Sequence, residues 1–243
     1  MGRVIMSGIV PTLKAPVTYK ANFADNTWAQ IIDACHKNQV PDTWVVGNSK
    51  TMLINDTEYQ IDIIGKGHDD YADGSGKAPL TFQMNKCYAG PYRMNSSNTT
   101  VGGWTSCDMR TTHLPALFAL LPSEIQNGIR EVNKLTSAGN GSSTINTTAD
   151  KLFLLSEIEV FGSKTYSYNG EGAQYEYYKV GNSKIKNRIN SPTIWWERSP
   201  STQSGIFCYV STSGSPDYIG ASYLYGGTCK PSAVPTNLPP FPP

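Results

Sequence analysis

Apolar residues at helical spacing mark the first predicted element. Four side chains fall at positions i, i+3, i+4 and i+7, a spacing that places them on one face of a helix: Trp28, Ile31, Ile32 and Cys35. This helix follows Asn26 and is expected to end near Asn38, before Pro41. The pattern therefore predicts an amphipathic helix with one buried face.

Alternating apolar and polar residues predict strands in the next part of the chain. Residues 50–54 and 58–64 are rich in β-forming side chains and flank a short polar turn at 55–57, which indicates a hairpin. After a glycine- and aspartate-rich loop at 65–77, apolar residues alternate with polar ones and predict a third strand: Leu80, Phe82 and Met84.

The middle of the chain carries two further helical signals. Apolar residues recur at helical spacing over residues 114–121, with Pro115 in the first turn and Pro122 at the end. Ser123 followed by Gln126 has the form of a capping box, so we expect a second, short helix that turns two apolar side chains inward: Ile125 and Ile129.

Another hairpin and a capped helix follow. Residues 132–136 and 144–148 flank a turn of glycine, asparagine and serine. Ser156 and Glu159 again match the capping box, and Gly162 is placed to close the short helix that they open.

The last third of the chain reads as short strands between turns. β-like runs cover 195–198, 206–211 and 218–223, and residues 231–243 form a proline-rich tail that is expected to be extended. Together with the earlier helices, these runs predict an α+β protein rich in loops.

Composition and charge narrow the possible functions. Only 16% of the residues are charged, against about 25% in an average soluble domain. The net charge of +1 leaves no basic field for nucleic acid. The longest apolar stretch, 114–121, is far shorter than the roughly 20 residues of a membrane span. We therefore expect neither nucleic acid nor a membrane as a partner.

Cysteines and the first residues suggest the compartment. The five cysteines are an odd number without a CxxC pair, which predicts reduced, buried thiols. Residues 1–10 lack the apolar core of a signal peptide. These features favour synthesis in a bacterial cytoplasm without secretory export.

Four segments carry a family resemblance: 62–76, 102–121, 151–162 and the sequence WWERSP at 195–200. Together they resemble the C-type-lectin-like domain of unknown function in tailed phages and prophages of gut Firmicutes. The chain is also similar to the variable proteins of diversity-generating retroelements and, more distantly, to the formylglycine-generating enzymes.

The resemblance implies a C-type-lectin-like fold, in which two to four helices flank small twisted antiparallel sheets joined by long loops. It implies a domain over residues 22–230, after an N-terminal segment at 1–21 that is a candidate anchor and before the tail at 231–243. The family's usual closing strand is replaced here by residues 226–231.

The resemblance and the chemistry of the side chains place a ligand-binding face near the C-terminus. Tyrosine offers a rigid amphipathic surface, and serine and aspartate offer adaptable hydrogen bonds. The expected ligand-binding residues are Tyr209, Ser211, Ser213, Asp217, Tyr218 and Tyr223. Trp195, Trp196 and Arg198 are expected to form a structural platform, with the two tryptophans on opposite sides of a strand and Arg198 able to pair with a buried carboxylate.

Other candidate sites carry weaker signals. The loop at 68–74, with Asp69, Asp70 and Asp73, could wrap a calcium ion, but an Asx-turn loop is favoured over it. Cys107 and His113 lack the spacing of a local catalytic pair, and Glu157 and Glu159 read as charges in the first turn of a helix rather than a glycosidase pair. We therefore expect no catalytic residues, metal or cofactor.

Three functions follow from these features. The first is a phage-type adhesin on the virion surface, which binds a bacterial surface glycan or protein. The second is a structural or decoration protein of the virion, which contacts other virion proteins or copies of itself and has no external ligand. The third and least favoured is a small oxidase or hydrolase.

Overall fold

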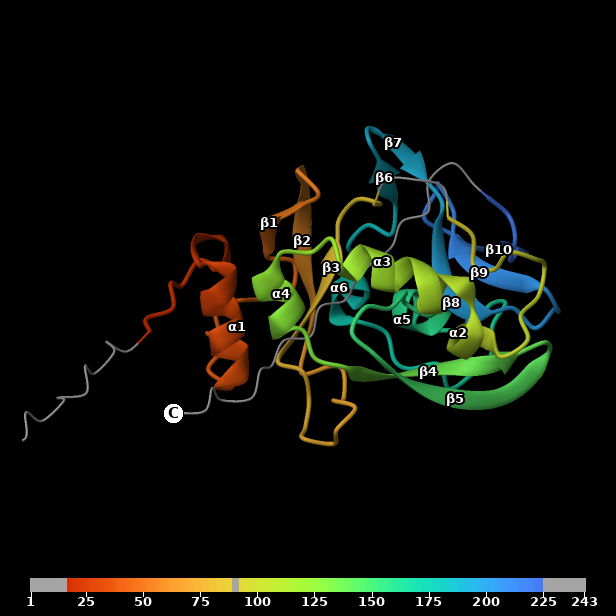
Figure 1. Ribbon diagram of the computed structural model, residues 1–243, viewed down its shortest axis with the longest axis horizontal. Helices are drawn as coiled ribbons and strands as arrows, with labels where there is room; N and C mark the ends of the chain where they lie inside the picture. The colour runs from red at the N-terminus through yellow and green to blue at the C-terminus, as the bar shows by residue number, and fades with distance from the viewer. Residues whose placement is uncertain (1–16, 89–91, 225–243) are drawn as a thin grey trace, which may run out of the picture.

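The computed structural model describes residues 17–88 and 92–224, which form short helices and four small antiparallel sheets (Figure 1). Two sheets have three strands, in the orders β1-β2-β3 and β10-β9-β8, and the pairs β4-β5 and β6-β7 are hairpins. The mixed α+β class predicted from the sequence is confirmed. Within the described chain, every helix is too short or too polar to cross a membrane.

The first helix and the first sheet pack together at one end of the molecule. Helix α1 (Trp28–His36) begins with a complete capping box, in which Gln30 N donates to Thr27 Oγ1 over 3.1 Å and Thr27 N donates to Gln30 Oε1 over 2.8 Å. Its apolar face is buried, and the Trp28 ring meets the Phe82 ring of the sheet edge to face. The predicted amphipathic helix is thus confirmed.

The predicted hairpin and third strand are confirmed in the first sheet. Strands β1 (Ser49–Ile54) and β2 (Thr57–Lys66) are joined through Asn55 and Asp56, both with the positive φ that a tight hairpin turn requires. Strand β3 (Leu80–Met84) pairs with β2 and is buried along its whole length.

The central helices follow the predicted positions with one difference in capping. A short α2 (Gly103–Ser106) and a π-helical turn (Met109–His113) lead into α3 (Leu114–Phe118), and α4 (Ser123–Gly128) follows. The predicted capping box of α4 is wrong. Pro122 holds the N-cap position, so Ser123 is already helical, and Gln126 Nε2 donates to Leu121 O over 2.7 Å instead. The predicted burial of Ile125 and Ile129 is confirmed.

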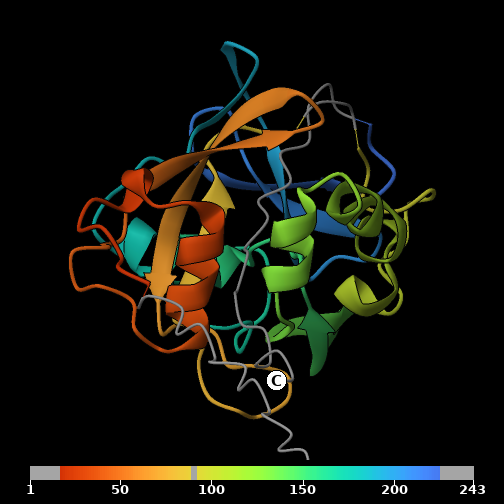
Figure 2. The same cartoon turned by 60° about the vertical axis from the view of Figure 1, so that its left-hand side comes forward.

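A close contact joins α4 to α1, which lie side by side in Figure 2. A Cβ at Gly128 would lie 2.6 Å from Ile32 Cδ1, nearer than packed atoms approach. Glycine at this position therefore lets the two helices touch.

The second predicted hairpin and the capped helix are confirmed. Strands β4 (Val132–Gly139) and β5 (Ser142–Asp150) form a long hairpin. Helix α5 (Glu157–Phe161) has the expected capping box from Ser156 and Glu159 and ends at Gly162, whose φ is 79°. Three short elements that the apolar pattern did not predict follow: α6 (Glu176–Lys179), β6 (Lys186–Arg188) and β7 (Ser191–Thr193).

The C-terminal sheet contains β8 (Trp195–Pro200), β9 (Ile206–Val210) and β10 (Pro216–Gly220). The last strand begins two residues before the predicted run and ends at Gly220. Trp195 and Trp196, which are neighbours in β8, are both fully buried. Packing covers both faces of β8, and the two indole N–H groups donate to Lys184 O and Tyr92 O.

Some predictions fall outside the described residues or need correction. Most of the candidate anchor at 1–21, the replaced closing strand at 226–231 and the proline-rich tail at 231–243 lie outside them. Cys35, Cys107 and Cys208 are free and buried, as expected. Cys87 is disulfide-bonded, so the prediction of reduced thiols is wrong for this residue.

Candidate functional site

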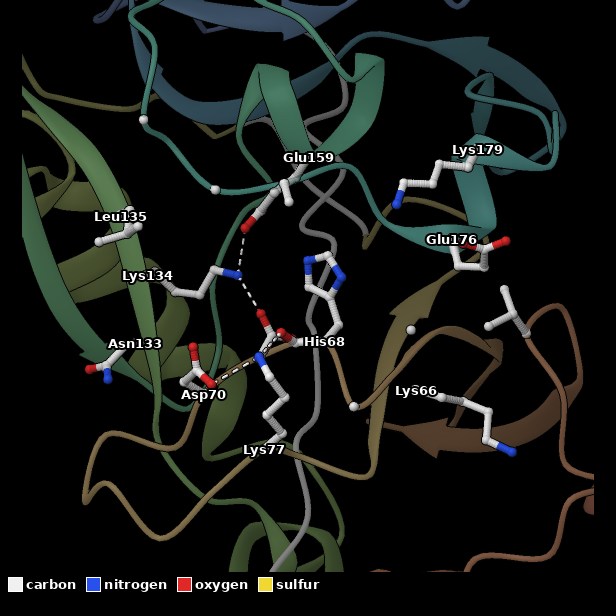
Figure 3. Close-up of a pocket in the computed structure, with 17 residues that line it drawn as sticks. Lys66, His68, Asp70, Lys77, Asn133, Lys134, Leu135, Glu159, Glu176 and Lys179 are labelled. Carbon is white, nitrogen blue, oxygen red and sulfur yellow. Dashed lines mark hydrogen bonds and ion pairs between the residues drawn. The ribbon is translucent and has the colours of Figure 1, made fainter.

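A pocket of about 790 Å³ lies between the first sheet and the central hairpin (Figure 3). Its wall is formed by the end of β2 and the following loop (65–70), by residues 133–135 of β4, and by the segment from 170 to 179 that includes α6. Glu159 of α5, which is almost fully buried, also lines the pocket. Segments that are distant in the sequence therefore build one cavity.

A buried ammonium group organises the floor of this pocket. Lys134 lies at an inward position of β4, and its Nζ is 2.7 Å from Asp69 Oδ1 and 2.6 Å from Glu159 Oε1. The Tyr175 hydroxyl lies 3.1 Å from the same Nζ. Because the Lys134 side chain is almost fully buried, these two carboxylates compensate the cost of burying its ammonium group.

Arg198, which does not line the pocket, forms a second ion pair with the Glu159 carboxylate. Its Nη2 donates to Glu159 Oε1 over 2.9 Å, and its Nη1 donates to Glu159 Oε2 and to Leu154 O. Burial opposes ionisation of this carboxyl, but the charges of Arg198 and Lys134 hold its pKa below the usual value. The expected pairing of Arg198 with a buried carboxylate is confirmed.

Asp69, like Glu159, has several buried hydrogen-bond and ion-pair partners. It accepts hydrogen bonds from Thr81 Oγ1 over 2.5 Å and from the Tyr175 hydroxyl over 2.8 Å, besides its ion pair with Lys134. Burial again opposes its ionisation, and the charge of Lys134 lowers its pKa below the usual value. The floor of the pocket is therefore a closed network.

His68 is the aromatic side chain that lines the pocket. Its ring stacks on the Tyr175 ring with centroids 3.9 Å apart, and no described residue hydrogen-bonds to its ring nitrogens. A Cβ at Gly65 would lie 3.0 Å from both side chains, so glycine leaves room for the stack. Burial lowers the pKa of His68, which favours the uncharged imidazole.

The donor atoms of the floor resemble a metal-binding set. Ligand atoms of His68, Asp69 and Glu159 lie within 4.8 Å of one another, and such nitrogen and carboxylate donors suit zinc. The Lys134 ammonium already bonds to both carboxylates. It therefore supplies the positive charge that a metal ion would bring.

The rim of the pocket is polar and open to solvent. Lys66, Glu176 and Lys179 are exposed, and Figure 3 shows the Lys179 ammonium directed towards His68. Gly170 and Gly172 both have positive φ, and a Cβ on Gly172 would lie 3.0 Å from Glu159 Oε1. Glycine thus allows this backbone to pass close above the floor.

The acidic loop does not direct its carboxylates to one ion. Asp69 binds Lys134, Asp70 binds Lys77 over 2.9 Å, and Asp73 binds Arg130. Asp73 Oδ1 also accepts a hydrogen bond from Ser75 N over 3.0 Å, which is the Asx-turn geometry that the sequence favoured.

The predicted C-terminal binding residues are only partly brought together. Tyr209 and Asp217 are cross-strand neighbours, joined by a hydrogen bond of 2.7 Å from the phenol to the carboxylate. Tyr218 follows Asp217 in the strand and so faces the opposite side, where its ring packs on Tyr166.

The remaining predicted residues lie in turns. Ser211 and Ser213 hydrogen-bond to each other over 2.9 Å, and Tyr223, 46% exposed, follows the last strand. The predicted residues therefore lie on two faces of the C-terminal sheet and in the turns beside it.

The sequence does not reveal that several carboxylates are buried. Glu157 and Glu159 lie in the first turn of α5, as expected, and both are fully or almost fully buried. Glu157 accepts hydrogen bonds from the backbone N–H groups of Tyr166 and Ser167. Glu197 is also buried, and no described residue hydrogen-bonds to its carboxyl oxygens.

Cys107 lacks the environment of a nucleophile. Its thiol is buried and donates weakly to Trp104 O over 3.4 Å. Burial raises its pKa to about 12, whereas a nucleophilic cysteine needs a lowered pKa.

One sequence signal could have located the pocket. Lys134 alternates in phase with Val132 and Thr136, so a lysine stands at an inward position of a predicted strand. A charge at such a position requires buried acidic partners, and Asp69 and Glu159 were among the candidate acidic residues.

Comparison with known proteins gives one family. Residues 79–235 match the family described as a domain of unknown function, DUF6273. Neither the curated proteins nor the solved structures contain a match to the chain. The matched region contributes β4, α5 and α6 to the pocket, while β2, His68 and Asp69 precede it.

Proposed function

The chain belongs to the DUF6273 family, and we propose that it is an adhesin-type domain that binds a surface glycan without catalysis. The binding site in this proposal is the pocket around His68. Its volume of about 790 Å³ falls within the range of pockets that hold small ligands.

One observation carries the proposal. On the floor, Asp69 and Glu159 both form ion pairs with Lys134, while the His68 imidazole and several polar side chains line the space above them. Carboxylates and ammonium groups whose hydrogen bonds are already made within the protein do not exchange protons with a ligand, but they can position it. Hydrogen-bonding groups around an aromatic ring suit the hydroxyl-rich surface of a sugar.

The resemblance supplies the biological setting. We place the domain on a phage virion surface, with a bacterial glycan or protein as its external partner and other virion proteins as its neighbours. The small antiparallel sheets, flanking helices and long loops support a C-type-lectin-like fold within the α+β class.

A structural role in the virion is the second candidate. It is supported by exposed apolar side chains on one segment, since Val180 is 64%, Ile185 42% and Ile189 79% exposed. Ile189 also has a positive φ of 57°, which is rare for a β-branched residue. Such a hairpin tip could contact another virion protein or a second copy of the chain.

Binding to cells separates these functions. Labelled protein would be applied to a panel of gut Firmicutes beside two variants with unchanged melting, His68→Ala in the pocket and the double variant Tyr218→Ala, Tyr223→Ala. Selective binding that only His68→Ala abolishes supports the proposed pocket, whereas loss in the double variant alone moves the site to the C-terminal face. No binding to any strain, together with a stable oligomer, contradicts the adhesin and supports the structural role.

A further inference from the structure

The charges that line the pocket leave a small positive excess at its rim. Asp69 and Glu159 are neutralised by Lys134 and Arg198, and Asp70 pairs with Lys77. Three charged residues of the lining then remain, and none of them forms an ion pair with a described residue: Lys66, Lys179 and Glu176. Two cations against one anion favour a negatively charged guest.

Backbone donors lie on the same side of the pocket. The N–H groups of Gly170, Gly172 and Ala173 form no hydrogen bond with any described residue, and all three residues line the cavity. Both glycines have positive φ, and a Cβ on Gly172 would lie 3.0 Å from Glu159 Oε1, whereas a Cβ on Gly170 would lie 3.2 Å from Ile145. These three backbone N–H groups are therefore free to donate to a ligand, and the glycine and alanine side chains carry no competing acceptor.

The side chains above the floor complete this arrangement. The Lys179 ammonium is directed into the pocket towards His68 (Figure 3), and an ammonium group is a donor without acceptor capacity. The carboxylates of the floor are already bonded to Lys134 and Arg198, so their repulsion of an anion is compensated.

From these contacts we infer that the pocket recognises an anionic group, a carboxylate or a phosphate, on its ligand. The group lies between Lys179 and the backbone of residues 170–173, beside the His68 ring. The inference rests on the proposed function and deepens it, because it assigns an acidic glycan or a sugar phosphate polymer as the ligand class.

Nuclear magnetic resonance with three small probes tests this inference. Isotope-labelled full-length protein would be titrated with glucuronate, glycerol 3-phosphate and methyl glucoside, in the wild type, Lys179→Met and Lys164→Met. Lys164 is exposed and outside the pocket, so it controls for the loss of one surface charge. Amide signals of Gly170, Gly172 and Ala173 report binding at the inferred position.

Saturable shifts of these amides with either anionic probe, and about threefold to fivefold weaker binding in Lys179→Met but not in Lys164→Met, support the inference. The more tightly bound anion identifies carboxylate or phosphate as the source. If methyl glucoside binds as tightly as the anionic probes, the inferred recognition of an anionic group is wrong, whereas the proposed binding of a glycan still holds. Absence of saturable shifts with all three probes would overturn both.

Discussion

Arg198 and Glu159, 39 residues apart in the chain, face each other inside the protein in a two-point ion pair. The Glu159 carboxylate also accepts a hydrogen bond from Ser156 N at the start of α5, and it forms an ion pair with Lys134 of β4. One side chain thus joins a helix start, the central hairpin and the C-terminal sheet. The WWERSP segment stabilises the pocket through this contact, although Arg198 itself does not line it.

We expect Glu159→Gln to destabilise the fold by about 3–5 kcal/mol, because Arg198 and Lys134 then lose a buried counter-charge. Urea unfolding measures the change. The control is Glu58→Gln, an exposed position on β2, for which we expect less than about 0.5 kcal/mol. A loss below about 1 kcal/mol for Glu159→Gln would show that the network contributes little.

Replacing Lys134 with methionine should lower stability and create affinity for zinc. The substitution removes the ammonium that bonds to both carboxylates, and it leaves His68, Asp69 and Glu159 near one another. Melting with and without zinc is the measurement, and the variant alone should gain stability with the metal. Adding His68→Ala should abolish that gain; a gain that persists would place zinc elsewhere.

Because Glu171 is buried, we expect the free energy of unfolding to depend on pH. Burial raises the pKa of its carboxyl from 4.5 to about 7. A raised folded-state pKa contributes stability below the unfolded value of 4.5, and this contribution is lost as the pH rises through about 7. The loss is about 3 kcal/mol between these limits.

The variant Glu171→Gln isolates this effect, since Ser137 N and the Ser199 hydroxyl can still bond to an amide. Relative to the variant, the wild type should become less stable between pH 5 and pH 8 in urea unfolding. A constant difference across this range would contradict the raised pKa.

The region that matches the family should not fold alone. A fragment of residues 79–235 lacks β2, which exposes the fully buried β3, and it lacks Asp69, the partner of Lys134. We expect poorly dispersed proton NMR spectra from the fragment and a dispersed spectrum from the full chain. A dispersed spectrum from the fragment would show that the first sheet is dispensable.

Local pattern was sufficient for the elements whose signals are local. The spacing of Trp28 and Ile32 predicted α1, and Ser156 with Glu159 predicted the capped start of α5. The same motif failed at Ser123, because the rigid φ of Pro122 moved the helix start by one residue. Alternation along β8 placed Trp195 and Trp196 on opposite sides of the strand, but it does not reveal that packing covers both sides.

The pocket could not be predicted from local sequence patterns, because its contacts join residues that are distant in the sequence. Lys134 and Asp69 are 65 residues apart, and their ion pair depends on how β2 and β4 pack. The inward phase of Lys134 indicated a buried charge, but not which acid would neutralise it. Only the structure shows that Lys66 and Lys179 form no ion pair with a described residue, whereas Asp69, Asp70 and Glu159 do.

The pocket wall draws on segments from Val46 to Lys179, so it exists only when those segments are assembled. A compound that binds there shifts the folding equilibrium by mass action, by about 2.7 kcal/mol at a hundredfold excess over its Kd. Thermal denaturation of the intact chain in the presence of candidate saccharides is therefore a general screen. It reports occupancy through the midpoint of unfolding, whatever the chemistry of the compound that binds.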